Sequence, residues 1–527
     1  MKKLIIPLLL FFQFTSIQKV SQSYDVVQKT GLQNLILVEN AEFIDTVRSI
    51  DDLKVYSKNE WINADKITKG EGFIEVSPLN NRYLQYENGV PYVPIGPNIC
   101  WSRTTTNPDK ALKQYNYYFK KMSENGANFT RIWLGAPLWE FEHERVGEFD
   151  IIKSDYLLDS LVNLATNYGI KLKFCIHNFR TLTESPPIFE GSVSMGRPMY
   201  NKKNGGPLET MDEYFGTDKG KNLFLERMNF LSKKYGNNPT VFGWELWNEI
   251  NAVNTSNKPE DILEWTAWML PKAKEIFPRH LVMQSMGSFD RNASRKWYKE
   301  FCIMNNNDIA QVHRYLDSGA ELDVCKGPMD ILAADATREL LSYNPGKPVI
   351  VSEVGAVEAN HAGPSNLYDV DSLGILLHDL IFAPFFSGSA SPGQSWHWHF
   401  YIDKHDLWWH YGRFEQVVKD INPILEDFKP LFVETADVRV YILMGETTTL
   451  IWCRDANNNW QTELIDKIQP NILKQSVSLD QIGIADKNIK TVKFFDPWKN
   501  KWTSGDTSGS DILIPDFTRS IILKITY

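Results

Sequence analysis

The sequence predicts an α/β protein, with a (β/α)8 barrel of the TIM type followed by a C-terminal antiparallel β-sandwich. Three observations support this prediction. Short apolar runs alternate eight times with amphipathic stretches between about residue 90 and residue 426, which is the pattern of repeated strand and helix units. No glycine-rich phosphate loop follows the first run, which favours a closed barrel over an open doubly wound sheet. From about Leu431 onward, short alternating runs and turn-rich segments indicate antiparallel strands.

The first element of the chain is an apolar N-terminal segment. Lys2 and Lys3 precede an apolar run from Leu4 to Phe14, which suits the core of a signal peptide and is too short to span a bilayer. We therefore interpret residues 1–22 as a signal peptide and expect a protein that is secreted, periplasmic or held at the cell surface. Residues 23–79 are too few for a sizeable core of their own, so we expect strands that pack on the barrel or on the sandwich.

The barrel is predicted to span residues 80–430. Its expected strands alternate with segments of helical periodicity, such as LLDSLVNLATNYG after the second strand and LFLERMNFLSKKYGNN after the third. The expected strands are YVPIG from Tyr92, NFTRIW from Asn128, IKLKFCIH from Ile170, TVFGWEL from Thr240, HLVMQS from His280, DIAQVH from Asp308, PVIVSE from Pro348 and SWHWHFY from Ser395.

Residues 431–527 are predicted to form the sandwich. Their alternating runs are VRVYIL, TTTLIWC, QSVSLD, TVKFF, DILIP and SIILKITY, and the intervening segments DANNN and TSGDTSGS are rich in turn-forming residues. This pattern is typical of a small antiparallel β-sandwich.

Composition and charge exclude several classes of function. The formal net charge is -9, from 56 basic and 65 acidic residues, so no basic excess could follow a phosphate backbone and we expect no nucleic-acid partner. The 5 cysteines are scattered without C-x-x-C spacing, which disfavours a zinc site and a disulfide framework. We expect no metal, no cofactor, a monomer, and no membrane span after the N-terminal segment.

Two glutamates stand at the ends of predicted barrel strands, where the active sites of such barrels lie. Glu249 follows the fourth strand in FGWELWNEIN, and Glu353 ends the seventh in VIVSEVGA. Strict alternation along the seventh strand would place Val349, Val351 and Glu353 on one side of it. Either glutamate alone suits a structural ion pair. Together, facing each other across the barrel mouth, two carboxyl groups are the minimum equipment for glycoside hydrolysis.

The residues around these acids resemble a known family. WNE at positions 247–249 and SEVG at positions 352–355 are similar to the motifs of the clan A retaining glycoside hydrolases, most of all to glycoside hydrolase family 5, which includes cellulases and β-mannanases. The resemblance covers most of the predicted barrel. It implies that Glu249 is the acid/base, that Glu353 is the nucleophile, and that Asn248 donates to the substrate 2-hydroxyl.

Other positions match the same family and are implied to bind substrate. Arg131 in FTRIW corresponds to the second-strand arginine that contacts the nucleophile. The remaining matches are His177 and Asn178 in CIHNF, His313 and Tyr315 in QVHRY, and Trp396 or Trp398 in SWHWHFY, one of which would lie under the sugar. The two tryptophans share one parity on the expected strand, so the choice between them stays open.

A retaining mechanism makes opposite demands on the two acids. Glu353 must be ionised to attack, which a guanidinium such as Arg131 would favour. Glu249 must begin protonated, and we expect the neighbouring negative charge and the indole-rich setting to raise its pKa. Glu245, which shares the parity of Glu249 one layer deeper, is expected to be a structural ion-pair partner.

The sequence therefore predicts a secreted retaining β-glycoside hydrolase that cleaves a β-linked polysaccharide by double displacement, with a β-mannan or β-glucan favoured. One alternative is an exo-acting enzyme of the same clan, such as a β-galactosidase. Another is a carbohydrate-binding surface protein without turnover, against which the presence of both acids argues. The predicted sandwich resembles domains that accompany such barrels, and either glycan binding or covering of the barrel would suit it.

Overall fold

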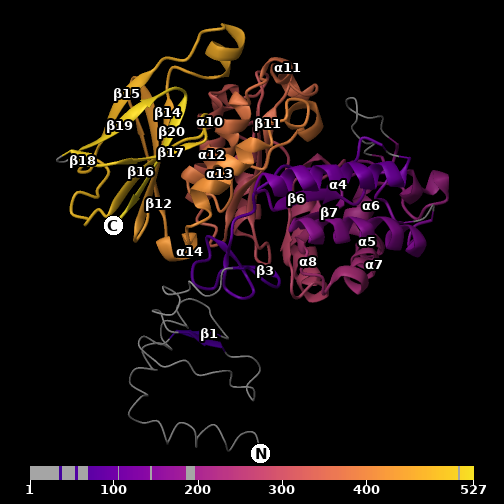
Figure 1. Ribbon diagram of the computed structural model, residues 1–527. Coiled ribbons are helices and arrows are strands. Elements are labelled where there is room, and N and C mark those ends of the chain that lie inside the picture. The colour runs from indigo at the N-terminus through magenta and orange to yellow at the C-terminus, as the bar shows by residue number, and fades with distance from the viewer. Residues whose placement is uncertain are drawn as a thin grey trace, which may run out of the picture.

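A computed structural model describes the main chain and side chains of residues 69–104, 106–142, 145–184, 196–506 and 511–527 (Figure 1). For residues 35–37, 54–56 and 507–508 it describes the main chain alone. There β1 (Leu35–Leu37) and β2 (Lys54–Tyr56) pair in parallel. The expected signal peptide lies outside the described residues, as do most of the residues 23–79 that were expected to form N-terminal strands.

The barrel is built from parallel strands with helices around them, and the C-terminal sheets lie beside it (Figure 1). Four strands form one sheet in the order β6-β7-β8-β9, and two more form the pair β10-β11. Their bounds are β6 (Phe129–Trp133), β7 (Lys171–His177), β8 (Val241–Trp247), β9 (Leu281–Met283), β10 (Ala310–Leu316) and β11 (Val349–Ala356). Every residue of β6, β8, β10 and β11 is buried, as expected for parallel strands covered on both faces.

Hydrogen bonds across the remaining gaps close the ring. The closing contacts are the bond from Asp308 N to Val282 O (2.9 Å), the parallel bridge between Val354 and Ser395, the bond from Asn98 N to Ser395 O (2.9 Å), and the parallel bridge between Asn98 and Arg131. Segments around Asn98 and Ser395 thus occupy the places of the first and eighth strands. The predicted (β/α)8 barrel is confirmed.

The first predicted strand is shifted along the chain. Tyr92 of YVPIG pairs with a neighbouring strand in a small antiparallel sheet, which consists of β3 (Ile74–Val76), β4 (Leu84–Tyr86) and β5 (Pro91–Tyr92). The buried side chains of this sheet pack on Phe129 and Phe242, which lie at the amino ends of β6 and β8. The apolar side chains at the start of YVPIG therefore pack at the base of the barrel. The barrel segment itself begins near Ile95, whose carbonyl accepts from Asn128 N and Phe129 N.

The eighth predicted strand is shorter than its apolar run. Ser395 makes the bridge to β11, but His397 adopts a left-handed conformation with φ 60 and residues Trp398–Ile402 form the π-helix η6. Trp398 packs on Trp101, with ring centroids 4.9 Å apart. The expectation that Trp396 and Trp398 share one face of a strand is therefore wrong, because the chain leaves extended geometry between them.

A β-bulge interrupts the seventh strand directly before Glu353. Val312 of β10 pairs with Val351, and the next residue, His313, pairs with Glu353, which leaves Ser352 as an extra residue. Because successive residues of β10 point to opposite faces, Val351 and Glu353 also do so. The strict alternation predicted for this strand is wrong.

Helices follow the strands in the predicted order. α5 begins after Asp150, whose side chain accepts from Lys153 N at 2.8 Å, and ends before Gly169 with φ 70, which are favoured residues for these caps. The helices are α4 (Pro108–Glu124), α5 (Ile151–Tyr168), α6 (Met211–Gly216), α7 (Asp218–Tyr235), α8 (Glu260–Ile276), α9 (Ser294–Ile303), α10 (Met329–Ser342), α11 (Leu367–Val370), α12 (Ile375–Phe386), α13 (Trp409–Val418) and α14 (Pro423–Glu426). Short turns are η1 (Pro198–Tyr200), η2 (Lys202–Asn204), η3 (Ile250–Ala252), η4 (Asp323–Lys326), η5 (Ala359–His361) and the π-helix η7 (Gln461–Ile465). Within the described ranges, none of the helices has the length and apolarity needed to cross a bilayer.

The C-terminal region is β-rich and antiparallel. Six strands pair in the order β12-β13-β14-β20-β16-β17, and three pair in the order β15-β19-β18. Their bounds are β12 (Lys429–Glu434), β13 (Val438–Met444), β14 (Thr448–Asp455), β15 (Leu473–Ser478), β16 (Thr491–Asp496), β17 (Lys501–Gly505), β18 (Thr507–Ser508), β19 (Asp511–Phe517) and β20 (Ser520–Thr526). Ile442 and Ile451 from the larger sheet share one apolar cluster with Ile512 and Phe517 from the smaller sheet.

Two buried ion pairs join the larger C-terminal sheet to the barrel helices. Arg439 of β13 donates to both oxygens of Asp330 on α10, at 2.6 and 2.9 Å. Arg454 of β14 donates to both oxygens of Asp379 on α12, at 2.7 and 3.2 Å. All four residues are buried. Each charge is paired through two hydrogen bonds, which offsets the cost of its burial and fixes the sheet against the helices.

Candidate active site

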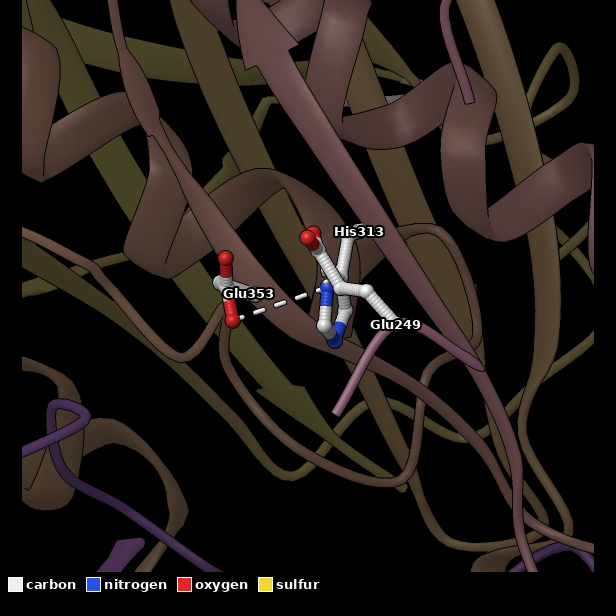
Figure 2. Close-up of side chains that lie close together, drawn as sticks. All are labelled: Glu249, His313 and Glu353. Carbon is white, nitrogen blue, oxygen red and sulfur yellow. Dashed lines mark hydrogen bonds and ion pairs between the residues drawn. The ribbon is translucent and has the colours of Figure 1, made fainter. Parts of the chain in front are cut away.

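Three side chains meet at the carboxyl ends of the barrel strands (Figure 2). Glu249 lies two residues after the end of β8, His313 lies in β10 and Glu353 lies in β11. His313 Nδ1 is 3.1 Å from Oε1 of Glu249 and 3.5 Å from Oε2 of Glu353. This nitrogen and one oxygen of each carboxylate all lie within 4.8 Å of one another. The structure thus brings the two predicted acids together at close range, with an imidazole between them.

Glu353 is held by donors from two other strands. Arg131 Nη1 donates to Oε2 at 2.7 Å, and the hydroxyl of Tyr315 donates to Oε1. Burial raises the pKa of Tyr315 well above its usual value, and the charge of Glu353 adds to this effect, so the phenol keeps its proton and serves as a donor. The guanidinium and the phenol together fix the orientation of the Glu353 carboxyl group.

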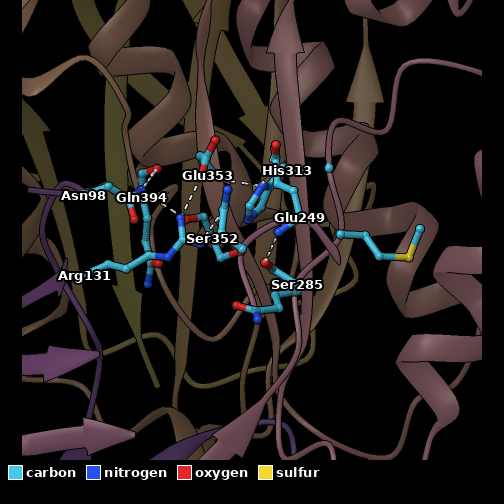
Figure 3. A network of polar contacts seen from close by, with 12 residues as sticks. Asn98, Arg131, Glu249, Ser285, His313, Ser352, Glu353 and Gln394 are labelled. Atoms are coloured by element: carbon cyan, nitrogen blue, oxygen red, sulfur yellow. Dashed lines mark hydrogen bonds and ion pairs between the residues drawn. The ribbon is translucent and has the colours of Figure 1, made fainter. Parts of the chain in front are cut away.

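Arg131 is the centre of the buried polar network around Glu353 (Figure 3). Its Nε and Nη2 donate to the two oxygens of Glu245 at 2.9 and 2.7 Å, and Nη2 also donates to Asn248 Oδ1 at 2.7 Å. Lys173 Nζ lies 3.2 Å from Glu245. Burial opposes the ionisation of Glu245, but the charges of Arg131 and Lys173 lower its pKa to about 2. Glu245 is therefore the structural ion-pair partner that its sequence position predicted.

Glu249 lies in a left-handed turn between β8 and η3. Its φ of 48 is uncommon for a residue with a side chain, and its N–H donates to Ser285 Oγ at 3.1 Å. Arg180 Nη2 donates to Oε2 of Glu249 at 2.7 Å. Burial alone would raise the pKa of Glu249, but the hydrogen bond from His313 and the charge of Arg180 lower it to about 2. The predicted rise of this pKa is wrong for this arrangement, because the hydrogen bond from His313 and the charge of Arg180 together outweigh burial.

Sequence reasoning overlooked several residues that hold the site. Asn98 Nδ2 donates to Ser352 O at 3.1 Å and to Gln394 O at 3.0 Å, which ties the first, seventh and eighth strands together (Figure 3). Ser285 and Arg180 both contact Glu249 from neighbouring strand ends. A polar residue at the carboxyl end of a predicted strand was the available signal in each case.

His177 lies away from the acids in an aromatic cluster. Its buried ring is surrounded, at centroid distances from 4.9 to 6.2 Å, by Phe179, Tyr200, Tyr214, Phe224 and Trp247. Burial lowers the pKa of His177 well below its usual value. The predicted substrate contact of His177 is therefore corrected to packing. Asn178 is buried close to Gly135 in the loop after β6, and its role stays a prediction.

The two candidate tryptophans differ in burial and in surroundings. Trp398 is 1% exposed and lies within η6, whereas Trp396 is 7% exposed. The Trp396 ring packs on Trp133 with centroids 5.5 Å apart, and Trp133 in turn lies under the guanidinium of Arg131 at 5.5 Å. This chain of contacts links Trp396 to the partner of Glu353, so Trp396 is the better candidate for the platform under a sugar.

Two groups of described side chains have a spacing that a metal ion could use. They are Glu249, His313 and Glu353, and a second group of Asp290, Asp317 and His361. In the first group Arg131 and Arg180 already place a positive charge on each carboxylate at 2.7 Å, which counts against a further cation there. In the second, His361 Nδ1 and Asp317 Oδ2 are hydrogen-bonded to each other at 2.9 Å.

The arrangement can act on a bond placed between the two carboxylates. Retaining glycosidases carry carboxyl groups about 5 Å apart, whereas inverting ones need roughly 6.5 Å or more to admit a water molecule. One oxygen of Glu249 and one oxygen of Glu353 lie within 4.8 Å of each other, which matches the retaining class. Glu353, with its charge partner and phenol donor, suits attack on carbon, and Glu249, with its imidazole neighbour, suits proton transfer.

Comparison with known proteins gives matches over the barrel. The family model described as cellulase (glycosyl hydrolase family 5) matches residues 87–374, which is more than half of the chain. Mannan endo-1,4-beta-mannosidase 7 of Arabidopsis thaliana is 24% identical over 303 residues, covering 51% of this chain and 65% of that protein. Putative mannan endo-1,4-beta-mannosidase 9 of Oryza sativa subsp. japonica is 27% identical over 215 residues, covering 36% and 51%. The chain thus spans between half and two thirds of the length of these relatives.

Two solved structures align with most of the chain. One described as a glycoside hydrolase aligns with a TM-score of 0.55 at 12% identity, covering 87% of this chain and 98% of the other. A glycoside hydrolase family 5 structure from Bacteroides vulgatus aligns with a TM-score of 0.53 at 14% identity, covering 86% and 93%. At these identities the likeness concerns the fold alone.

Proposed function

Because the chain belongs to the cellulase family, glycosyl hydrolase family 5, we propose that it is a retaining β-glycoside hydrolase that cleaves a β-linked mannan. The family membership predicted from WNE and SEVG is confirmed by the match over residues 87–374. The observation that carries the proposal is the approach of a Glu249 oxygen and a Glu353 oxygen to within 4.8 Å of each other, from β11 and from the turn after β8.

The proposed reaction proceeds by two displacements. In the first, Glu353 attacks the anomeric carbon while protonated Glu249 gives its proton to the glycosidic oxygen, so that the bond breaks and one sugar leaves with a new hydroxyl. In the second, Glu249 takes a proton from water, the water oxygen attacks the same carbon, and the ester bond to Glu353 breaks. The product keeps the β configuration. Asn248, oriented by Arg131 at 2.7 Å, is proposed to contact the substrate 2-hydroxyl.

The choice of mannan is supported by the two plant relatives, both of which are named as mannan endo-1,4-beta-mannosidases. A second candidate is exo action at a chain end. The Glu353 side chain is only 5% exposed, and such enclosure suits a pocket as well as a groove. Secretion is supported by the apolar run from Leu4 to Phe14 after two lysines.

The C-terminal region is proposed to be a β-sandwich that braces the barrel. Its two sheets share an apolar cluster, and its larger sheet reaches the barrel through the buried pairs of Arg439 with Asp330 and Arg454 with Asp379. Binding of glycan by this region is the alternative, and it would need aromatic side chains exposed on one face.

A panel of polysaccharides tests the proposal. The full chain and its Glu353→Gln variant are incubated with β-1,4-mannan, glucomannan, soluble β-1,4-glucan and β-1,4-galactan, and the products are separated by chromatography. Mannan should yield a ladder of oligosaccharides if action is endo, or a single short product if it is exo. Equal product from both proteins, or no product from any polymer, would overturn the proposal.

A further inference from the structure

Arg180 contacts the proposed acid although it belongs to none of the matched motifs. Its Nη2 donates to Oε2 of Glu249 at 2.7 Å. Its own carbonyl accepts from Asn254 N at 2.8 Å, which anchors the main chain of Arg180 to the loop after β8. The side chain is 34% exposed, whereas that of Glu249 is 14% exposed. The main chain of Arg180 is therefore fixed, while its guanidinium borders solvent.

The position of Arg180 relative to the two acids shows which side of the substrate's glycosidic bond Arg180 would face. Oε1 of Glu249 points to His313, which also approaches Glu353, whereas Oε2 points to Arg180. Arg180 follows β7, which pairs with β8, and Glu353 lies in β11 across the ring. The sugar under attack must lie over Glu353, so the departing sugar extends past Glu249 on the side away from Glu353. Arg180 occupies that side.

We propose that Arg180 is a leaving-group sensor: its guanidinium holds the Glu249 carboxylate while the leaving-group side is empty and gives up this contact when a sugar enters there. This inference rests on the proposed function, because it takes Glu249 as the acid. It deepens that function, since an enzyme of this design works on a bond between two sugars and responds poorly to a substrate with one sugar alone.

The physical reason lies in the charge state of Glu249. A guanidinium at hydrogen-bond distance favours the carboxylate, and an ionised Glu249 has no proton to give at neutral pH. Once the contact breaks, the hydrogen bond from His313 still favours the carboxylate, but the charge of Arg180 no longer adds to it, and burial and the nearby Glu353 charge both favour the protonated form. The proton then comes from solvent, passes to the glycosidic oxygen as the carbon–oxygen bond breaks, and is replaced by one from the attacking water.

Arg180 differs from the other groups that face Glu249. These groups are His313 and Tyr315 from β10, Tyr298 from α9, Glu353 from β11 and His361 from the loop after β11. His313, Tyr315, Tyr298 and Glu353 are buried within the barrel. His361 is about as exposed as Arg180 but is anchored to Asp317 at 2.9 Å. Arg180 combines direct contact with a free path to solvent, which suits displacement by a ligand.

A pH profile of kcat/KM with two substrates tests the proposal. β-Mannotetraose requires an acid for its leaving sugar, whereas 2,4-dinitrophenyl β-mannoside has a leaving group that needs none. In Arg180→Gln, the alkaline limb measured with mannotetraose should move up by at least one pH unit, because Glu249 keeps its proton more easily. The limb measured with the dinitrophenyl substrate should not move.

Two further variants separate this role from a structural one. Arg180→Lys keeps a cation and should restore most of the parent profile. Lys258→Gln removes a neighbouring cation whose pKa is lowered by burial and by the charge of Arg180. Among the described residues Lys258 makes no hydrogen bond or ion pair with Glu249, so this variant should leave the alkaline limb in place. Equal shifts in Arg180→Gln and Lys258→Gln, or parallel losses on both substrates without a shift, would overturn the proposal.

A titration without turnover keeps the test independent of the proposed activity. The protein is labelled with carbon-13 at glutamate carboxyl groups, and the Glu249 signal is assigned with Glu249→Gln. Without substrate, the pH midpoint of the Glu249 titration should be higher in Arg180→Gln than in the parent. In Glu353→Gln, the same midpoint should rise when mannotetraose binds and should stay unchanged when mannose binds. An unchanged midpoint in Arg180→Gln overturns the sensor, whereas a raised midpoint in a protein that cleaves no polymer would overturn only the proposed function.

Discussion

His313 Nδ1 lies 3.1 Å from Oε1 of Glu249, and the same imidazole approaches the Glu353 carboxylate. This nitrogen and one oxygen of each carboxylate lie within 4.8 Å of one another. Such a spacing leaves no room for a water molecule to attack from the face opposite the leaving group. We therefore expect the first product of hydrolysis to carry the β configuration. Proton NMR in the first minutes of reaction, before mutarotation, measures it. An α product would contradict the assignment of Glu353 as nucleophile.

Azide should distinguish the two acids by the anomer that it forms. In Glu353→Gly, turnover should fall by more than about 10³-fold, and azide entering the vacated space should give an α-glycosyl azide. In Glu249→Ala, azide should attack the glycosyl enzyme from the face that water uses and give a β-glycosyl azide. Both reactions are followed with 2,4-dinitrophenyl β-mannoside, since its leaving group needs no acid. The reverse pattern of anomers would exchange the roles of the two residues.

Removal of Arg131 should cost stability as well as activity. Arg131→Met leaves Glu245 and Glu353 buried without the guanidinium that donates to both, and breaking a buried pair in this way costs about 3–5 kcal/mol. Urea unfolding of the full chain measures the loss. Arg82→Met is a matched control, because its pair with Asp427 is partly exposed and should be worth about 1 kcal/mol or less. Similar losses in the two variants would contradict the central place of Arg131.

Glu245 should make the protein sensitive to acid. Its pKa is lowered from 4.5 to about 2 in the folded chain, so the unfolded chain binds a proton first as pH falls. The stability that ionised Glu245 contributes is complete above about pH 4.5 and is lost as pH falls toward 2, and it is on the order of 3 kcal/mol. Urea unfolding at pH 6 and pH 3 should show this loss in the parent and a smaller one in Glu245→Gln. An equal loss in both would contradict the prediction.

The C-terminal region should unfold together with the barrel. Arg439 and Asp330 form a buried pair between β13 and α10, so Arg439→Ala and Asp330→Ala should each destabilise the protein by about 3–5 kcal/mol. Since each variant breaks the same pair, the double variant should lose less than the sum of the single losses. Calorimetry should record one transition in the parent. Additive losses, or two separate transitions, would contradict a bracing role.

The strands that carry the acids were predictable from local pattern. Six apolar runs appear as β6 to β11 because strands buried on both faces read as continuous apolar segments. Glu249 and Glu353 interrupt or end such runs, and the chemistry of two facing carboxylates follows from that placement. The first and eighth runs misled the prediction, since YVPIG joins a sheet at the base of the barrel and SWHWHFY coils into η6 after Ser395.

Alternation failed where backbone geometry departed from the ideal strand. The bulge at Ser352 places Val351 and Glu353 on opposite faces of the strand. No residue in VIVSEVGA predicts this bulge. His177 was expected to bind substrate by its place in CIHNF, yet its ring is enclosed by aromatic side chains from α6, α7 and β8 as well as from its own loop. A motif match cannot predict that segments distant in the chain will bury a side chain such as that of His177.

The sequence by itself determined the barrel class, the order of its strands and the placement of Glu249 and Glu353 at strand ends, because these depend on periodicity and on residues adjacent in the chain. The resemblance implied the contact of Arg131 with Glu353, but only the tertiary structure decided that Arg131 also pairs with Glu245 and that Arg180 faces Glu249. Arg131 meets Glu245 across 114 residues and Glu353 across 222, and Arg180 meets Glu249 across 69. A carboxyl group's pKa depends on charges within a few ångströms, and those neighbours are assembled by the closing of the ring rather than by the order of the chain.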